Sequence, residues 1–414
     1  MTERAVDDAI IRAHRGEWSR VVAGLARRFG DLQTAEDAAA EAFAAAVERW
    51  PHDGVPPNPG AWLTTTATRK AIDRLRRESR RDEKHQEAQV LFDDDPADAP
   101  GVIDDDRLRL IFTCCHPALS PEARIALTLR MVGGLTVPEI ARAFLSTEAT
   151  IGQRITRAKG KIKAAAIPYR VPTAEDLPAR LGGVLAVLFL IFNEGYLATG
   201  AETAPVRTEL SAEAIRLTRL LHELLPDPGG EVTGLLALML LTDARRPARV
   251  SATGELVTLD EQVRGAWHSD LIEEGQRLVR ERLAAVTAGG PPPGRYQLLA
   301  AINAVHTYPR DARDTDWSQI VALYDQLLRI DPSPVVALNR AVAVAELDGP
   351  DVALALVHRL PLEGYDAFHA TRAELLRRLG RAKEAHEAYD RAIELTRNTA
   401  EAAYLIRRRS QLGH

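Results

Sequence analysis

Two groups of basic side chains have the residue types and spacing that most directly suggest a chemistry. The first group lies within residues 69–81 and comprises Arg69, Lys70, Arg74, Arg76, Arg77, Arg80 and Arg81. The second lies within residues 154–163 and comprises Arg154, Arg157, Lys159, Lys161 and Lys163. A cation placed against a phosphate releases counterions, so both groups favour contact with a nucleic-acid backbone. The alternative is a solvated helix face stabilised by opposite charges one turn apart.

Two short helices are expected to position the second basic group. Thr136 precedes the apolar stretch VPEIARAFL, and a break at Ser146 and Thr147 leads into the basic stretch EATIGQRITRAKGKIK. Two short helices separated by a tight turn, the second of them basic, indicate a helix-turn-helix. The N-terminal residues of the second helix usually contact base edges. We therefore expect Thr150 and Gln153 to read bases while the cations hold phosphates.

The only two cysteines, Cys114 and Cys115, are followed directly by His116. A metal site would need further ligands, and no Cys or His of suitable spacing lies in the same segment. Pro117 ends one helix, and Ser120 with Pro121 opens the next as its cap and first residue. Because free cysteine behaves as a small buried hydrophobe, packing at this joint is the favoured interpretation. A redox-responsive thiol and a metal site are the alternatives.

The composition limits the class of protein. The chain has 414 residues, of which 46% are hydrophobic, and a formal net charge of −5, so it is globular and not basic as a whole. It contains no run of about 18 apolar residues, and its charged start lacks the apolar segment of a signal peptide. Adjacent cysteines form no disulfide framework, so we expect a cytoplasmic protein. No nucleotide-binding, hydrolase or metalloprotease motif is found, so we expect no enzymatic activity, no cofactor and no metal.

Apolar residues recur at helical spacing almost throughout, which predicts an all-α fold. We expect a helix capped by Thr34, a loop from His52 to Gly60 because of its Gly and Pro content, and then a helix carrying the first basic group. The acidic stretch of residues 93–106 has no period and predicts a solvated linker.

The part after about residue 167 is more apolar. The stretch PARLGGVLAVLFLIFNEGYLA predicts a helix too short and too interrupted to span a membrane. Polar residues after this helix (FNEGY) and after a later one (LLTDARRPAR) are interpreted as caps and buried ion pairs, with a regulator or ligand site as the alternative. Tyr324 and Tyr389 occupy similar stretches, separated by close to twice the roughly 34-residue tetratricopeptide period. This predicts a tetratricopeptide-like helical array at the C-terminal end.

Two sequence blocks carry a resemblance to a known family. DLQTAEDAAAEAFAAAVERW and NPGAWLTTTATRKAIDRLRRE together resemble region 2 of an extracytoplasmic-function sigma factor of the sigma-70 family. ALSPEARIALTLRMVGGLTVPEIARAFLSTEATIGQRITRAKGKI resembles region 4, and order and spacing agree over residues 10–165. The long tail resembles the subgroup with a large C-terminal helical extension. The chain departs from the family at Ala40, where an amide is usual, and at Lys70, where Asn commonly follows Arg. In the second helix of the helix-turn-helix, Ala149 replaces a usual Gly, and Gly152 stands where Lys or Arg is common.

The resemblance implies five segments in an all-α chain. They are region 2 (residues 1–82), an acidic flexible linker (83–105), region 4 with its helix-turn-helix (106–167), a helical extension domain (168–290) and tetratricopeptide-like repeats (291–414). It also implies a sigma factor that binds the β′ clamp and β flap of core RNA polymerase and directs promoter recognition and transcription initiation. The tail would regulate or support this activity and bind a protein or peptide, with no membrane partner.

The resemblance also assigns roles to residues. The polymerase-facing block would contain Glu36, Asp37, Glu41 and Phe43. The loop with His52, Asp53 and Asn58 would capture an unstacked minus-ten base beside the first basic group, or else be an ordinary proline-stiffened connection. Thr150, Gln153 and the second basic group would bind the minus-thirty-five element.

Two other functions are alternatives at this point. One is a helix-turn-helix regulator that senses a ligand or partner through its tail and never binds polymerase. The other is a tetratricopeptide adaptor whose basic helices are incidental. The region 2 block favours the sigma factor over an ordinary regulator, because such a regulator has no need of it.

Overall fold

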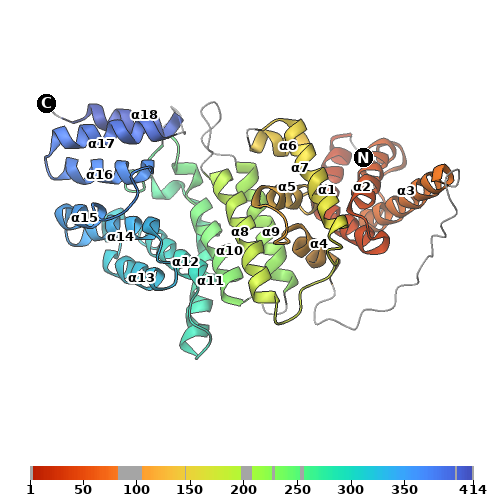
Figure 1. The fold of residues 1–414 in the computed structure, drawn as a ribbon, viewed down its shortest axis with the longest axis horizontal. Helices are drawn as coiled ribbons and strands as arrows, with labels where there is room; N and C mark the ends of the chain where they lie inside the picture. The colour runs from red at the N-terminus through yellow and green to blue at the C-terminus, as the bar shows by residue number, and fades with distance from the viewer. Residues whose placement is uncertain are drawn as a thin grey trace. The chain divides into compact units, whose positions relative to one another are not determined.

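A computed structural model of the protein describes residues 3–82, 105–144, 146–196, 208–225, 229–251, 256–396 and 399–412. Every named element in these ranges is a helix, and one isolated antiparallel bridge joins Val250 to Leu256 (Figure 1). The all-α prediction is therefore confirmed. The expected linker, residues 83–105, lies outside the described residues except for Asp105. The chain forms two compact units, residues 1–191 with 224–226, and residues 192–223 with 227–414.

The first unit begins with a bundle of three helices. These are α1 (Glu3–Phe29), α2 (Leu32–Asp53) and α3 (Pro59–Asp82), and each packs against the other two. α2 contributes buried alanines to the contact, which let the helix axes approach closely. Trp50 and Leu63 fill the core between α2 and α3.

The ends of α2 and α3 correct two sequence predictions. Asp31 rather than Thr34 caps α2, because its carboxylate accepts the Gln33 N–H at 2.8 Å. The expected loop from His52 to Gly60 is shorter at both ends. α2 continues through Pro51 to Asp53 and ends where Gly54, at φ 83°, donates its N–H to Trp50. α3 already begins at Pro59, since the Asn58 side chain accepts the Ala61 N–H at 3.0 Å.

The next four helices are α4 (Asp106–Cys114), α5 (Pro121–Met131), α6 (Val137–Ala143) and α7 (Glu148–Ala164). Their starts follow the expected signals. The Ser120 hydroxyl accepts the Ala123 N–H at the start of α5, and Thr136 with Glu139 forms a reciprocal capping box at the start of α6. α5, α6 and α7 pack against one another, which confirms the predicted helix-turn-helix.

The two cysteines are buried at the joint between α4 and α5. Cys114 is 0% exposed and Cys115 is 2% exposed. Burial raises the pKa of Cys114, and it raises the pKa of Cys115 to about 11 although the Thr128 hydroxyl lies 3.4 Å from its sulfur. Both thiols are therefore protonated at neutral pH, and the packing prediction is confirmed. Within the described ranges, no three His, Cys, Asp or Glu side chains are grouped to hold a metal ion.

α8 (Leu177–Tyr196) corrects the prediction about its length. It is one continuous helix of 20 residues and meets the length and hydropathy of a membrane-spanning helix. Neither Gly182 nor Gly183 interrupts it, because helix-interior glycine costs only about 1 kcal/mol relative to alanine. Length and composition alone do not place it in a membrane, since the core helix of a soluble protein meets the same criterion.

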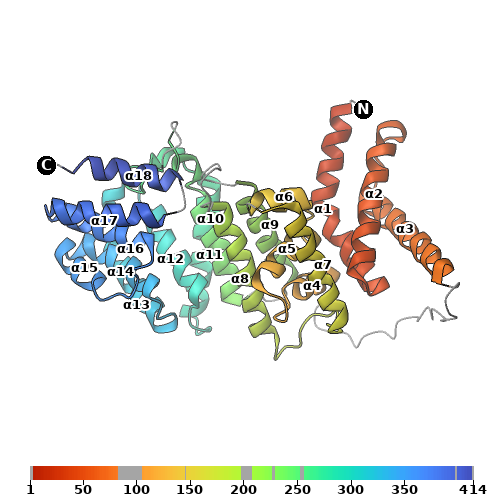
Figure 2. The ribbon, with the colours of Figure 1, turned by 45° about the horizontal axis from the view of Figure 1, so that its top comes forward.

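The second unit continues the helical succession. It contains α9 (Thr208–Leu224), α10 (Gly229–Asp243), α11 (Ser269–Thr287), α12 (Arg295–Thr307), α13 (Trp317–Ile330), α14 (Pro334–Leu347), α15 (Pro350–Val357), α16 (Asp366–Arg378), α17 (Ala382–Leu395) and α18 (Thr399–Ser410). From α10 onward, each helix packs against the next one in the chain (Figure 2). Neighbour-to-neighbour packing is typical of helical repeat arrays. The tetratricopeptide identity of residues 291–414 stays a prediction.

The predicted ion pairing after α10 is present in this unit. Asp243 is 3% exposed and its carboxylate lies 3.5 Å from the Arg246 guanidinium. The Arg249 guanidinium lies over the Tyr196 ring at 3.7 Å, and Arg245 is 3.5 Å from the Tyr196 hydroxyl. These contacts support the interpretation as capping and ion pairing.

Candidate nucleic-acid and polymerase interface

The basic helix α7 divides cleanly into a buried and an exposed face. Ile151, Ile155, Ala158 and Ile162 are buried against the rest of the helix-turn-helix. The predicted contact residues Thr150, Gln153, Arg157 and Lys161 are exposed, and Arg154 is half-buried. The helical repeat of 3.6 residues places these side chains on the outer face, where a DNA groove can be reached.

Lys159 differs from its basic neighbours on α7. It is only 8% exposed, and its ammonium contacts the Glu36 carboxylate and the Gln33 side-chain oxygen, the latter at 2.9 Å. The other Glu36 oxygen accepts a hydrogen bond from Arg130 Nε at 2.5 Å. Glu36 is itself 8% exposed. We call these four side chains the Glu36 network; they join α2 to α5 and α7.

The electrostatics of the Glu36 network favour an ionised carboxylate. Burial alone would raise the pKa of Glu36, but the charges of Lys159 and Arg130 and their hydrogen bonds outweigh it and hold the pKa below its ordinary value of 4.5. A buried carboxylate between two cations is stable only while both partners stay in place.

A second contact between the first three helices and α5 is centred on Trp18 of α1. Its ring is 3% exposed, and its indole N–H lies 3.2 Å from the carbonyl oxygens of both Arg130 and Met131. The Arg130 guanidinium lies over the ring at 5.5 Å, and the Phe43 ring is 5.7 Å away. Gly134, at φ 76°, packs so closely that a Cβ there would lie 3.0 Å from the Trp18 ring.

A third contact follows α7. The Tyr169 hydroxyl lies 3.0 Å from the carbonyl oxygens of Ala23 in α1 and Asp106 in α4. Burial raises the pKa of Tyr169, so its hydroxyl stays protonated and can donate. Arg27 of α1 lies 3.6 Å from the Asp106 carboxylate. The three contacts together hold α1–α3 and α4–α7 in one packed unit (Figure 1).

The predicted polymerase-facing residues differ in exposure. Asp37 and Glu41 are both half-buried. The Asp37 carboxylate lies 2.8 Å from the Arg74 guanidinium, and the Glu41 carboxylate lies 3.7 Å from the Lys70 ammonium. Two predicted polymerase contacts are thereby paired with two predicted DNA contacts. Phe43, by contrast, is 7% exposed.

The predicted minus-ten residues lie at the other end of α2 and along α3. His52, Asp53 and Asn58 are exposed around the short connection between the helices, and His52 Nδ1 lies 3.1 Å from the Glu48 carbonyl oxygen. Asn58 also caps α3, as described above. Three further cations of the first basic group, Arg69, Arg76 and Arg77, are exposed along α3.

Sequence reasoning missed the residues that join the two helical groups. Trp18 and Tyr169 give no signal beyond that of ordinary apolar residues, and Arg130 lies outside both basic groups. Their partners are distant in sequence, so no local periodicity indicates the contacts.

Comparison with known families matches both helical groups. Residues 11–81 match Sigma-70 region 2, and residues 109–162 match Sigma-70, region 4. Residues 180–283 match a family of unknown function, DUF6596. These matches coincide with the three-helix bundle and the helix-turn-helix, so the chain contains a Sigma-70 region 2 domain and a Sigma-70 region 4 domain.

Similar proteins cover different shares of this chain. The chain belongs to the family of an uncharacterized protein of Rhizobium meliloti (strain 1021), R00370, which is 43% identical over 99% of this chain and 95% of that protein. The probable ECF RNA polymerase sigma factor SigI of Mycobacterium tuberculosis (strain ATCC 25618 / H37Rv) is 29% identical over 47% of this chain and 70% of its own length. The ECF RNA polymerase sigma factor SigK of Mycobacterium ulcerans (strain Agy99) is 28% identical over 37% of this chain and 82% of its own length. No solved structure gives a significant match.

Proposed function

We propose that this chain is an extracytoplasmic-function sigma factor that binds core RNA polymerase and directs transcription initiation in the cytoplasm, without catalysis of its own. The observation that carries the proposal is the presence of both sigma-70 domains in one chain, the second with an exposed polar face on α7. A regulator that only bound DNA would need the second domain alone.

The proposed roles follow the exposed side chains. On α7, Thr150 and Gln153 contact bases, while Arg154, Arg157 and Lys161 hold phosphates. His52, Asp53 and Asn58 hold an unstacked minus-ten base, and the first basic group holds the DNA backbone around it. Asp37 and Glu41 contact polymerase at the edge of α2.

Glu36, Phe43 and Lys159 have the same proposed roles, but they require a rearrangement. All three side chains are buried in the packed unit. Lys159 reaches a phosphate, and Glu36 reaches polymerase, only after α1–α3 and α4–α7 separate. The Phe43 ring packs against His14 and Trp18 of α1, so its contact with polymerase requires a rearrangement within α1–α3. We therefore propose that the packed unit is a closed form and that the polymerase-bound form is open.

The segment boundaries implied by the resemblance are part of the proposal: region 2 in residues 1–82, a linker in 83–105, region 4 in 106–167, an extension domain in 168–290 and tetratricopeptide-like repeats in 291–414. The tail is proposed to regulate or support the sigma activity through a protein or peptide partner. Its neighbour-to-neighbour helix packing supports this role, because such arrays present extended binding surfaces.

The test is transcription by purified core polymerase on a genomic promoter library, with and without the full chain. We expect the chain to co-elute with core polymerase and to direct initiation at a defined set of promoters. DNA binding without co-elution would favour the helix-turn-helix regulator instead. A chain that neither co-elutes nor binds DNA would contradict both functions.

A further inference from the structure

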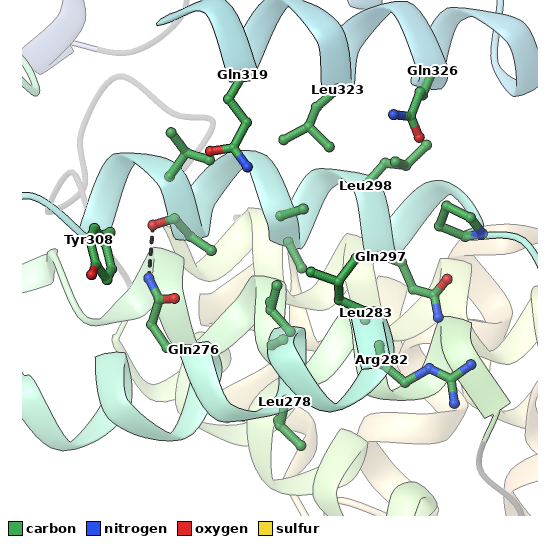
Figure 3. A pocket seen from close by; sticks show the side chains of 18 of the residues that line it. Gln276, Leu278, Arg282, Leu283, Gln297, Leu298, Tyr308, Gln319, Leu323 and Gln326 are labelled. Carbon is green, nitrogen blue, oxygen red and sulfur yellow. Dashed lines mark hydrogen bonds between the residues drawn. The ribbon is translucent and has the colours of Figure 1, made fainter. Parts of the chain in front are cut away.

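The second unit contains a cavity of about 580 Å³ between α10, α11, α12 and α13 (Figure 3). The cavity is open to solvent, and its volume lies within the range of about 300–1,000 Å³ that is typical of clefts and cavities that bind small molecules. Every wall of the cavity comes from this one unit, so the site needs no other part of the chain.

Most of the cavity wall is aliphatic. Its apolar lining includes Leu278, Val279, Val286, Leu298, Ala301 and Leu323. Water bound to such a surface would find few hydrogen-bond partners, so an apolar ligand is the better occupant. The lining side chains run along α11 from Gln276 to Val286, which corresponds to about 15 Å of helix. An elongated apolar body fits this length.

One end of the cavity is lined by Gln297 and Arg282, each of which has a buried nitrogen without a hydrogen-bond acceptor in the described ranges. Gln297 is 8% exposed, and its carbonyl oxygen accepts the Gly294 N–H at 2.9 Å. Its amide nitrogen has no hydrogen-bond partner among the described residues, and the same is true of Arg282 Nε. Figure 3 shows the Arg282 guanidinium and the Gln297 amide near each other at this end. Both nitrogens are themselves buried, so the guanidinium of the half-buried Arg282 is the polar group at this end that a ligand can reach.

The orientation of Gln297 is fixed by the neighbouring helix. A Cβ at Gly230 would lie 1.8 Å from the Gln297 amide nitrogen, so glycine there is what admits this side chain. Glu231 lies close by, but its carboxylate accepts the backbone N–H groups of Tyr296 and Gln297 at 3.0 and 3.3 Å. The Arg282 guanidinium has no carboxylate partner among the described residues, so it can pair with an acidic ligand.

The opposite end of the cavity carries the other sign of charge. Asp314 and Asp316 line it just before the start of α13. The Gln276 amide nitrogen at this end donates to the Ala304 carbonyl oxygen at 2.8 Å. An anionic group is therefore repelled at the aspartate end and attracted at the Arg282 end, which orients the ligand.

We propose that this cavity binds a medium-chain carboxylic acid. The carboxylate pairs with the Arg282 guanidinium, and the apolar chain lies among the aliphatic side chains of α11, α12 and α13. The inference does not depend on the sigma function, because it uses only contacts within the second unit.

The test is calorimetric titration of the full chain with sodium decanoate, with decylamine as a probe of the same chain length and opposite charge. We expect decanoate to bind at one site per chain and to raise the melting temperature, and decylamine not to bind. Arg282→Ala should weaken decanoate binding about tenfold or more, because it removes a charged donor. Arg280→Ala is the matched control, since Arg280 is exposed on the same helix and does not line this cavity.

A second variant tests the cavity without touching the donors. Ala301→Trp places a large side chain in the cavity and should abolish binding, with circular dichroism showing that the variant is folded. Absence of saturable decanoate binding would overturn the proposal. So would equal affinity for decylamine, or unchanged decanoate affinity in either Arg282→Ala or Ala301→Trp.

Discussion

Replacing Lys159 by methionine should loosen the contact of α7 with α2. Methionine keeps most of the side-chain volume and removes the ammonium, so the variant tests the charge rather than the packing. Glu36 keeps Arg130, whose Nε lies 2.5 Å from its carboxylate. The loss is then about one charged hydrogen bond, or roughly 1.5–3 kcal/mol. Glu36→Gln should cost more, about 3–5 kcal/mol, because it leaves two cations without their shared partner.

The double variant, Glu36→Gln with Lys159→Met, should cost less than the sum of the two single changes. Once Glu36 is replaced by the neutral glutamine, the buried Lys159 ammonium has no opposite charge and destabilises the folded protein. Methionine at position 159 removes this buried charge. We expect a coupling of roughly 1–3 kcal/mol, within the range seen for contacting residues. Lys161→Met is the control on the same helix, since Lys161 is exposed.

Hydrogen exchange of the full chain, followed by mass spectrometry on peptides from α2 and α7, measures these costs. Each 1.4 kcal/mol of lost protection should speed exchange about tenfold in both helices. Lowering the pH should also reduce the protection of α2 and α7 against exchange. The pKa of Glu36 is lowered in the folded protein, so the network stabilises fully above about pH 4.5 and is lost as the pH falls through the lowered value. Purely additive single changes, or an equal effect of Lys161→Met, would refute the network as the contact that holds the unit closed.

Three further outcomes follow from the first unit. The two cysteines should react slowly with a thiol reagent in the native protein and fast in urea, since burial raises the pKa of Cys115 to about 11; fast native labelling would contradict their burial. Arg154→Ala with Arg157→Ala should weaken all promoters alike in the transcription assay, while Gln153→Ala should change which promoters are used; identical promoter profiles would refute these roles. Gly152→Ala should raise the free energy of unfolding by about 1 kcal/mol in urea titrations, because a Cβ there meets no atom within 4 Å and alanine favours the helix; a destabilised variant would show that the glycine is required.

Much of the fold could be predicted because its determinants are local. Ser120 with Pro121, and Thr136 with Glu139, set helix starts through side chains within one turn of the backbone they cap. The same local reasoning failed at the end of α2, where the Gly and Pro content predicted a loop from His52 onward. A proline in the last turn removes one backbone donor, but Gly54 closes the helix beyond it, so α2 ends later than the proline suggests.

The candidate site could be predicted only in part. The exposed face of α7 follows from helical periodicity, and Gln153 and Arg157 lie on it as expected. The burial of Lys159 does not follow from its own helix, because its partner Glu36 comes from a different one. A basic residue flanked by exposed basic residues carries no local sign that an acid from a distant helix covers it.

The burial of Lys159 has a consequence for how binding should respond to salt. The affinity of a protein for duplex DNA falls with salt concentration by a slope of about 0.9 for each phosphate that a cation neutralises. While Lys159 is paired with Glu36, α7 has one cation fewer that can neutralise a DNA phosphate. When the unit opens and Lys159 binds a phosphate, the slope of affinity against salt concentration should become steeper by about 0.9. The slope of affinity against salt then reports how many chains are open, in a measurement that needs neither polymerase nor a known promoter.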